Sequence, residues 1–364
     1  MINVTKTTLP PINKYIKYLK KVWMNNWITN KGEFTLQLEK ELKNYLKVKN
    51  LSVVSNGTIA MQLAFKALKL KGEVITTPFT FPATTNSLIW EGLKPVFADI
   101  DPETFNIDAK EIEKKITKET SAILAVHVFG NPCDVEAIEK IAKKYNLKII
   151  YDSAHAFGIE YKDKSVLSWG DINTLSFHAA KVFHTAEGGA VIARKKRDYQ
   201  MLDLLKNHGI EYYDKVVIAG INAKMNELQA IMGLCVLEDF EKSIIKRKKI
   251  YQRYKEAFLK NPLIKIQKLH NNLTKYTYPY FPVFFPDEKT RERIFKVLLK
   301  NGIRARKYFY PPCHEFPYIK YSSSDLPNAT KISHTILCLP LYATLTTKDH
   351  ERIINLVNKA LLSL

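Results

Sequence analysis

The chain has 364 residues, of which 46% are hydrophobic, so it can bury the core of one large domain and of a smaller second one. Its net charge of +20 makes nucleic-acid binding one interpretation, but the charge is spread over the whole chain, which favours a lysine-rich surface without a nucleic-acid partner. No apolar run reaches the roughly 20 residues of a membrane span, and the first residues lack the pattern of a secretory signal, so we expect a cytoplasmic protein without a membrane partner.

Between residues 51 and 195, short apolar runs alternate with helical patterns. Helices are predicted over 58–70 and 82–90, and a third begins at the cap Asp134 and continues to Tyr145. Strand–helix alternation with continuous apolar strands predicts an α/β fold whose mainly parallel sheet is covered on both faces. The predicted strands are 51–54, 74–77, 95–98, 122–128, 148–151, 174–177 and 190–193.

The pattern changes from about residue 240 onward, where we expect a smaller α/β domain. The predicted division is a large domain over 1–240, with an N-terminal arm, and a C-terminal domain over 241–364. The elements expected in the second part are a long basic helix over 237–260, an apolar run at 279–285, a helix over 289–300, an aromatic proline-rich loop over 308–321 and a helix over 347–362.

The basic run Lys246–Lys249 gives nucleic-acid binding its best support. Ile244, Ile245, Tyr251 and Tyr254 interleave with these charges at roughly helical spacing. This pattern is typical of an amphipathic helix with one solvated side, and we favour that interpretation. The four cysteines are scattered without a CxxC pair, so we expect reduced thiols and no metal site.

Two charged residues follow neighbouring predicted strands. Asp152 ends one apolar run, and Lys181 follows the next, 29 positions later. Ligands of parallel sheets bind beyond the strand ends. A carboxylate and an amine are what an enzyme needs to hold pyridoxal 5'-phosphate (PLP), because the acid keeps the pyridine nitrogen protonated and the amine forms a Schiff base with the aldehyde. Taken singly, Asp152 is also compatible with a turn cap and Lys181 with a surface charge.

The turn Ser55–Thr58 joins a predicted strand to a predicted helix. Backbone N–H groups and a hydroxyl at a helix N-terminus form a phosphate site. Asn-Gly is also a generic turn sequence, so this segment alone does not decide between the two interpretations. Ser176 is placed to add a second hydroxyl to the same phosphate.

Several motifs occur together in a fixed order along nearly the whole chain. With them the sequence resembles the DegT-type family of nucleotide-sugar aminotransferases, which are PLP enzymes of the aspartate-aminotransferase fold (fold type I). The motifs are 27–32 (WITNKG), 55–58 (SNGT), 78–84 (PFTFPAT), 95–101 (PVFADID), 127–130 (HVFG), 152–156 (DSAHA), 176–181 (SFHAAK), 187–189 (EGG), 220–222 (GIN) with Met225 and Gln229, and 339–342 (LPLY).

The resemblance implies a role for each matching residue around the cofactor. Lys181 would carry PLP as the catalytic residue, Asp152 would pair with the pyridine nitrogen, and Phe81 would stack on the ring. His155 stands where many relatives have Gln, near the phenolic oxygen of the cofactor, and a histidine can also donate a hydrogen bond there.

The resemblance also implies how the phosphate is held. Gly57, Thr58 and Ser176 would bind it from one subunit. Asn222 resembles an asparagine that reaches the phosphate from the other subunit, which implies a homodimer with a shared active site. The diphosphate of the substrate requires cations, and the candidate substrate-binding residues are His178, Lys31, Arg306, Lys307, Tyr310 and His314.

The implied reaction is a transamination. L-glutamate would convert PLP to pyridoxamine phosphate and leave as 2-oxoglutarate, and the amino group would then pass to a keto carbon of a nucleotide-linked sugar for glycan or O-antigen biosynthesis. The segment 178–189 resembles enzymes that aminate C4, which favours dTDP-4-keto-6-deoxyglucose. The alternatives are C3 amination of a dTDP-3-keto-6-deoxyhexose, UDP or GDP in place of dTDP, and a catalytically silent regulator of the same fold.

Overall fold

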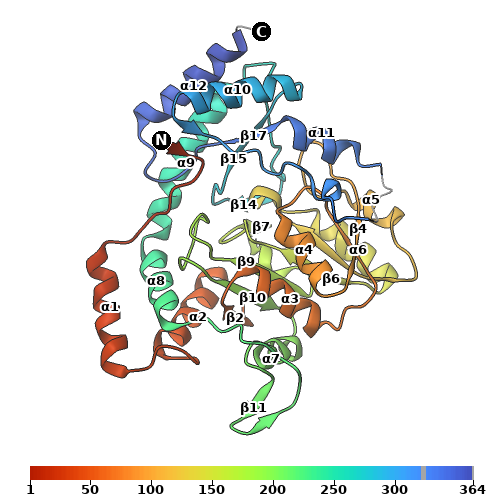
Figure 1. The fold of residues 1–364 in the computed structure, drawn as a ribbon, viewed down its shortest axis with the longest axis vertical. Coiled ribbons are helices and arrows are strands. Elements are labelled where there is room, and N and C mark those ends of the chain that lie inside the picture. The colour runs from red at the N-terminus through yellow and green to blue at the C-terminus, as the bar shows by residue number, and fades with distance from the viewer. Residues whose placement is uncertain (321–324, 363–364) are drawn as a thin grey trace.

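The computed structural model describes residues 1–320 and 325–362 and places a seven-stranded sheet at the centre of the molecule (Figure 1). The order across the sheet is β2-β10-β9-β6-β5-β3-β4. Strand β10 runs in the direction opposite to the other six strands, which are parallel to one another. Each predicted strand is present within two residues at either end. The strands are β2 (Leu51–Val54), β3 (Glu73–Thr76), β4 (Lys94–Phe97), β5 (Thr120–Val126), β6 (Lys148–Asp152), β9 (Ile172–Ser176) and β10 (Gly189–Ala193).

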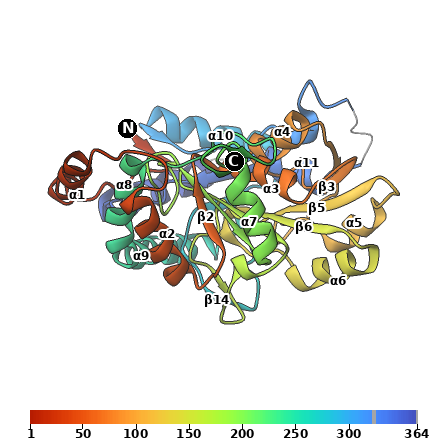
Figure 2. The same ribbon diagram turned by 90° about the horizontal axis from the view of Figure 1, so that it is seen from below.

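Helices cover both faces of this sheet, which is why its strands are apolar at consecutive positions. On strand β5, Leu124 packs in the core beneath α3, whereas Ile123 and Ala125 pack in the core beneath α6. Figure 2 shows α3 and α4 on one side of the sheet and α6 on the other. The helices of this part are α2 (Glu33–Leu46), α3 (Gly57–Ala67), α4 (Pro82–Trp90), α5 (Ala109–Lys114), α6 (Val135–Tyr145) and α7 (Lys196–Leu205).

The helix boundaries follow from local chemistry. The predicted helix 82–90 is present with these limits, and Asp134 caps α6 by accepting a hydrogen bond from the N–H of Ala137. The helix predicted over 58–70 ends earlier, at Ala67, because Lys69 turns the chain into the left-handed region with φ of 55°.

The C-terminal part is a second, smaller layer of helices on a sheet. Its sheet has the order β13-β15-β17 and is antiparallel. The predicted helix 289–300 and the helix 347–362 are present. The elements are β13 (Lys265–Ile266), β15 (Phe281–Phe284), α10 (Glu288–Lys300), β16 (Ile303–Arg304), α11 (Pro327–Thr335), β17 (Ile336–Leu339) and α12 (Thr347–Leu362). Tyr321, the last residue of the predicted aromatic loop, lies outside the described residues.

The long basic helix predicted over 237–260 is in fact the end of one helix and the whole of another. Helix α8 (Glu227–Glu238) and helix α9 (Phe240–Phe258) meet at Asp239, whose ψ of 10° interrupts the helical path. The charges of α9 do not all face solvent. Arg247 is buried together with Ile244, Tyr251 and Tyr254, whereas Ile245 is exposed.

Arg247 is buried because the helical repeat places it on the same face as those three apolar residues. Its guanidinium donates a hydrogen bond of 2.9 Å to the carbonyl oxygen of Leu341, and burial lowers its pKa to about 10. The amphipathic helix expected from the sequence is therefore present, with one residue of the basic run serving as an internal anchor.

The first residues of the chain lie against its last third. Strand β1 (Ile2–Asn3) pairs in parallel with β16, and the N–H of Leu341 donates to the carbonyl of Val4 at 3.0 Å. Helix α1 (Ile12–Asn25) then packs along α8 at the side of the molecule (Figure 1). The division into domains over 1–240 and 241–364 stays a prediction, and residues 2–4 contact the second of these segments.

Smaller pieces complete the fold. A hairpin of β11 (Ile210–Tyr212) and β12 (Lys215–Val216) projects from the body beside α7 (Figure 1), and β7 (Glu160–Tyr161), β8 (Lys164–Ser165) and β14 (Leu273–Lys275) form a separate small sheet. All four cysteines are buried and unpaired. Among residues 1–320 and 325–362, no helix combines the length and the apolarity that crossing a bilayer requires.

Candidate active site

Asp152 is the last residue of β6, one of the central parallel strands. Its carboxylate is almost completely buried and accepts two hydrogen bonds, from the Thr84 hydroxyl at 2.7 Å and from the N–H of Ala154 at 3.1 Å. A buried acid that is held in this way keeps a fixed orientation at the strand end. It faces the same cavity as Lys181.

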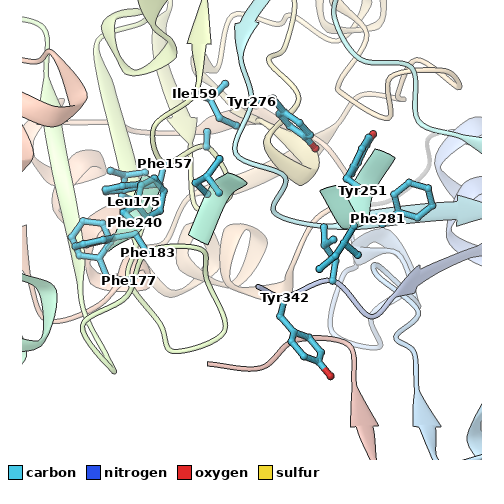
Figure 3. Close-up of a cluster of buried hydrophobic side chains, with 14 of the residues drawn as sticks. Phe157, Ile159, Leu175, Phe177, Phe183, Phe240, Tyr251, Tyr276, Phe281 and Tyr342 are labelled. Atoms are coloured by element: carbon cyan, nitrogen blue, oxygen red, sulfur yellow. The ribbon is translucent and has the colours of Figure 1, made fainter. Parts of the chain in front are cut away.

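Lys181 lies in the loop that leaves β9. The rings of Phe177 and Phe183, on either side of it in sequence, are fully buried and meet edge to face with centroids 4.8 Å apart. Phe183 also stacks on Phe157 at 4.3 Å and lies near Phe240 of α9 (Figure 3). These contacts anchor both ends of the loop in the core, so the position of the Lys181 backbone is determined by packing.

The Lys181 ammonium is only partly exposed, and desolvation lowers its pKa to about 8, although the nearby Asp152 carboxylate opposes the shift. A lysine with this pKa is substantially neutral at mildly alkaline pH, and the neutral amine is the form that attacks carbonyl carbons.

The N-terminus of α3 borders the same cavity. Asn56 caps this helix by accepting the N–H of Ile59 at 2.9 Å, and Gly57 and Thr58 begin the helix beside it. Ser176 lies against Gly57 so closely that a Cβ on Gly57 would come within 2.8 Å of the Ser176 Cβ. A helix N-terminus with a glycine and hydroxyl groups is a favourable place for a phosphate.

These groups line one cavity of about 410 Å³. Gly57, Thr58, Phe81, Asp152, His155, Ser176, His178, Lys181 and Arg306, all predicted site residues, line it. Its volume lies within the usual range for cofactor and small-molecule sites. The structure therefore brings most of the predicted site together.

His155 is buried between aromatic rings at the edge of the cavity. Its ring is parallel to those of Phe129 and Phe309, and the ring of Tyr280 is 4.7 Å away. Burial, assisted by the charge of Lys181, holds the pKa of His155 well below its usual range. His155 is thus neutral, and one of its nitrogens can donate a hydrogen bond while the other accepts one.

The C-terminal part supplies the opposite wall. Tyr280, Tyr308 and Phe309 line the cavity, and the guanidinium of Arg306 lies 4.7 Å over the Tyr308 ring. His178 and Glu187 also line the cavity, and their side chains approach to 3.7 Å. The cavity thus combines an amine, the carboxylates of Asp152 and Glu187, a helix N-terminus and one arginine.

Five predicted residues lie outside this cavity: Asn222, Lys31, Lys307, Tyr310 and His314. Lys31 is 2.6 Å from the Asp203 carboxylate, and Lys307 is bonded to Glu292. His314 is 3.2 Å from the Thr330 hydroxyl, and Arg291 lies 4.9 Å over the Tyr310 ring. Within one chain, therefore, none of the five lines the cavity, and Lys31, Lys307, Tyr310 and His314 have partners outside it.

Several cavity residues were missed by the reasoning from sequence, among them the aromatic residues Tyr280, Tyr308 and Phe309. Tyr280 lies in a run that was predicted only as an apolar element, and Tyr308 and Phe309 lie in a loop without periodicity. Thr84, behind Asp152, belongs to the motif at 78–84, but nothing in its spacing indicates a bond to a residue 68 positions later. Only the concentration of aromatic residues around these positions was a signal.

Comparison with known proteins places the chain in a family of aminotransferases. Residues 12–358 match the family described as the DegT/DnrJ/EryC1/StrS aminotransferase family. The chain is 43% identical over 367 residues to a dTDP-4-amino-4,6-dideoxy-D-glucose transaminase of Shigella dysenteriae, with 98% of each protein covered.

Two solved structures are similar over most of their length. DesI, crystallised in the presence of its TDP-sugar product, has a TM-score of 0.93 and 31% identity, covering 99% of this chain and 93% of DesI. NtdA of Bacillus subtilis, with bound cofactor PMP, has a TM-score of 0.90 and 28% identity, covering 96% and 82%. The predicted aminotransferase fold is confirmed, and the chain belongs to the DegT/DnrJ/EryC1/StrS aminotransferase family.

Proposed function

We propose that the protein is a PLP-dependent aminotransferase that transfers the amino group of L-glutamate to C4 of dTDP-4-keto-6-deoxyglucose. The observation that carries the proposal is the meeting of Asp152, Lys181 and the N-terminus of α3 in one cavity. The name of the Shigella dysenteriae relative, a dTDP-4-amino-4,6-dideoxy-D-glucose transaminase, supports the sugar and the carbon.

The residues present fit PLP. Gly57, whose neighbour Ser176 leaves no room for a Cβ, would hold the phosphate together with Thr58 and Ser176. Asp152 would hold the ring nitrogen through a carboxylate that is already oriented by two hydrogen bonds. When bound, the pyridinium ring supplies an electron sink for reactions at an amino-bearing carbon.

Lys181 would act both as the amine that binds the cofactor aldehyde and as the carrier of a proton at Nζ. Its pKa of about 8 supports this double role, because near that pH the amine can both take up and release a proton. His155 would hold the phenolic oxygen of the cofactor as a neutral ring. The aromatic residues Tyr280, Tyr308 and Phe309 would exclude water from the cavity.

We infer further that the active unit is a homodimer in which Asn222 completes the partner's cavity. Asn222 is exposed and lies outside the cavity of its own chain. The hairpin before it exposes Tyr212, Tyr213 and Val216, and a contiguous exposed apolar group of this kind indicates a protein interface. Mixing inactive Lys181→Ala and Asn222→Ala chains under exchange should restore about a quarter of native turnover, since statistical mixing gives half heterodimers with one native site each.

The experiment that tests the reaction combines the protein, PLP, L-glutamate and dTDP-4-keto-6-deoxyglucose and identifies the product by NMR. We expect an amine on C4 and one 2-oxoglutarate per product. An amine on C3, or turnover only with a UDP- or GDP-linked sugar, would contradict the proposed substrate.

The matched control is Lys181→Ala, which should abolish turnover and retain binding of the nucleotide sugar. A protein that stays colourless after addition of PLP would contradict the cofactor. Normal turnover by Lys181→Ala would contradict the role of this amine, whatever the product.

A further inference from the structure

The Asp152 carboxylate is the end of a short chain of hydroxyl groups. One of its oxygens accepts a hydrogen bond from the Thr84 Oγ1 at 2.7 Å, and the Thr84 Oγ1 lies 2.8 Å from the Thr80 Oγ1. The other oxygen accepts the N–H of Ala154 at 3.1 Å. The three hydrogen-bonded side chains are all buried: Thr80 is 1% exposed, Thr84 is 0% exposed and Asp152 is 6% exposed.

The direction of this chain follows from counting hydrogens. A threonine hydroxyl has one hydrogen to donate, and an ionised carboxylate can only accept. Because Thr84 gives its hydrogen to Asp152, Thr80 must donate to Thr84. Hydrogen bonds are therefore donated from Thr80 to Thr84 and from Thr84 to Asp152. Each group has its hydrogen-bond partner only when its neighbour is in place.

Local structure places the two threonines for this purpose. Helix α4 begins at Pro82, so Thr84 lies in its first turn and Thr80 just before it. The C-terminal part holds this connection in place, since the N–H of Cys313 donates to the carbonyl of Pro78 at 2.8 Å. Thr80 and Asp152 line the cavity, whereas Thr84 lies behind Asp152 and does not.

We propose that Thr84 is a positioning residue for the cofactor-binding carboxylate, and that Thr80 orders the Thr84 hydroxyl. The inference rests on the proposed role of Asp152. With one oxygen held by Thr84 and the other by Ala154, the carboxylate cannot rotate about its last bond without breaking a hydrogen bond. Its free lone pairs therefore keep one direction, towards the cavity.

The test compares Thr84→Val, which keeps the shape and removes the hydroxyl, with Thr84→Ser, which keeps the hydroxyl. The apo protein is titrated with PLP, and the dissociation constant is read from the visible absorption. We expect Thr84→Val to bind PLP about 10-fold more weakly, the equivalent of roughly 1.4 kcal/mol, and Thr84→Ser to stay within about 2-fold of the native protein. Thr80→Val should weaken binding by a smaller factor, because the Thr84 hydroxyl then loses its donor.

A second readout follows the visible band of the bound cofactor against pH. The pH at which this band has changed by half, its midpoint, should differ from the native value in Thr84→Val and equal the native value in Thr84→Ser. The reason is that the band responds to how firmly the ring nitrogen is held. The control is Thr76→Val, which also removes a buried hydroxyl, here bonded to the carbonyl of Leu124 at 2.8 Å, on the strand β3 before this segment. Thr76→Val should lower thermal stability without moving the midpoint.

The outcomes separate the inference from the proposed function. Native-like PLP binding and an unmoved midpoint in Thr84→Val would overturn the positioning role. So would a loss that Thr84→Ser does not rescue, because the effect would then be one of packing. If the native protein itself fails to bind PLP, the proposed function fails first. Loss in Thr84→Val with rescue in Thr84→Ser supports the inference.

Discussion

The lowered pKa of Lys181 makes a prediction that needs no substrate. With a pKa of about 8, about a quarter of the side chain is neutral at pH 7.5, whereas a lysine with the ordinary value of 10.5 is neutral in about one molecule in a thousand. In the apo protein, Lys181 should therefore react with a trace of acetic anhydride far faster than an ordinary lysine. Mass spectrometry of the labelled peptides, over a series of pH values, gives the midpoint for each lysine.

Two comparisons sharpen this experiment. Lys162 is the internal control, because its hydrogen bond to Glu136 raises its pKa. Asp152→Asn removes the carboxylate that favours the charged amine, so the midpoint of Lys181 should fall below that of the native protein. A Lys181 midpoint near 10 or above, or one that Asp152→Asn leaves in place, would refute the reasoning.

The same shift predicts how stability depends on pH. Since the folded pKa lies below the unfolded value, the unfolded chain binds more protons between pH 8 and 10.5, and stability from this group increases with pH across that window. At pH 7 the charged amine destabilises the apo fold by roughly 1–3 kcal/mol, reduced by the partial exposure of the side chain. Lys181→Met should thus raise the melting temperature of the apo protein at pH 7, and the gain should shrink towards pH 10.

Three further substitutions test other parts of the structure. Gly57→Ala places a Cβ against Ser176 and overpacks this contact, so it should weaken PLP binding at least about 10-fold in an absorbance titration and also lower the melting temperature of the apo protein. Lys206→Met leaves the buried carboxylate of Glu39 without its cation and should lower the free energy of unfolding by about 3 kcal/mol in urea titrations; an unchanged unfolding midpoint would contradict it. Burial holds His155 neutral, so His155→Gln should leave the pH dependence of turnover unaltered between pH 6 and 9. If the substitution removes the acidic or the basic limb of the profile of turnover against pH, the imidazole titrates and the reasoning is wrong.

The parts of the site that could be predicted from the sequence lie at the ends of buried strands. Asp152 and Lys181 could be placed because a continuous apolar run indicates a buried strand, and a charged residue at the end of such a run, or a few residues after it, lies near the sheet edge. The turn at Gly57 was readable for a similar reason, since it joins a strand to a helix. In each case the information is local, within a few residues of the functional group.

The parts that could not be predicted depend on contacts between distant segments. Tyr280 and Phe309 reach the cavity only through the packing of the C-terminal sheet, and neither sits in a period that specifies which way it faces. Arg247 lies in a run of basic residues whose pattern predicts exposure to solvent, and only the position of α9 in the fold shows that its side chain is buried. The break between α8 and α9 was missed because Asp239 is an ordinary helix-surface residue in sequence.

The pairing of β1 with β16 bears on how the chain is made. Ile2 is synthesised about 300 residues before its partner Ile303, and at the usual 5–20 residues per second the delay is roughly 15–60 s. A two-residue strand cannot hold a conformation alone, so β1 has no stable partner until β16 has been synthesised. The pairing of β1 with β16 therefore forms only after most of the chain has been made, and because Thr5 lines the catalytic cavity, a bulky tag fused before Met1 would disturb both this pairing and the cavity.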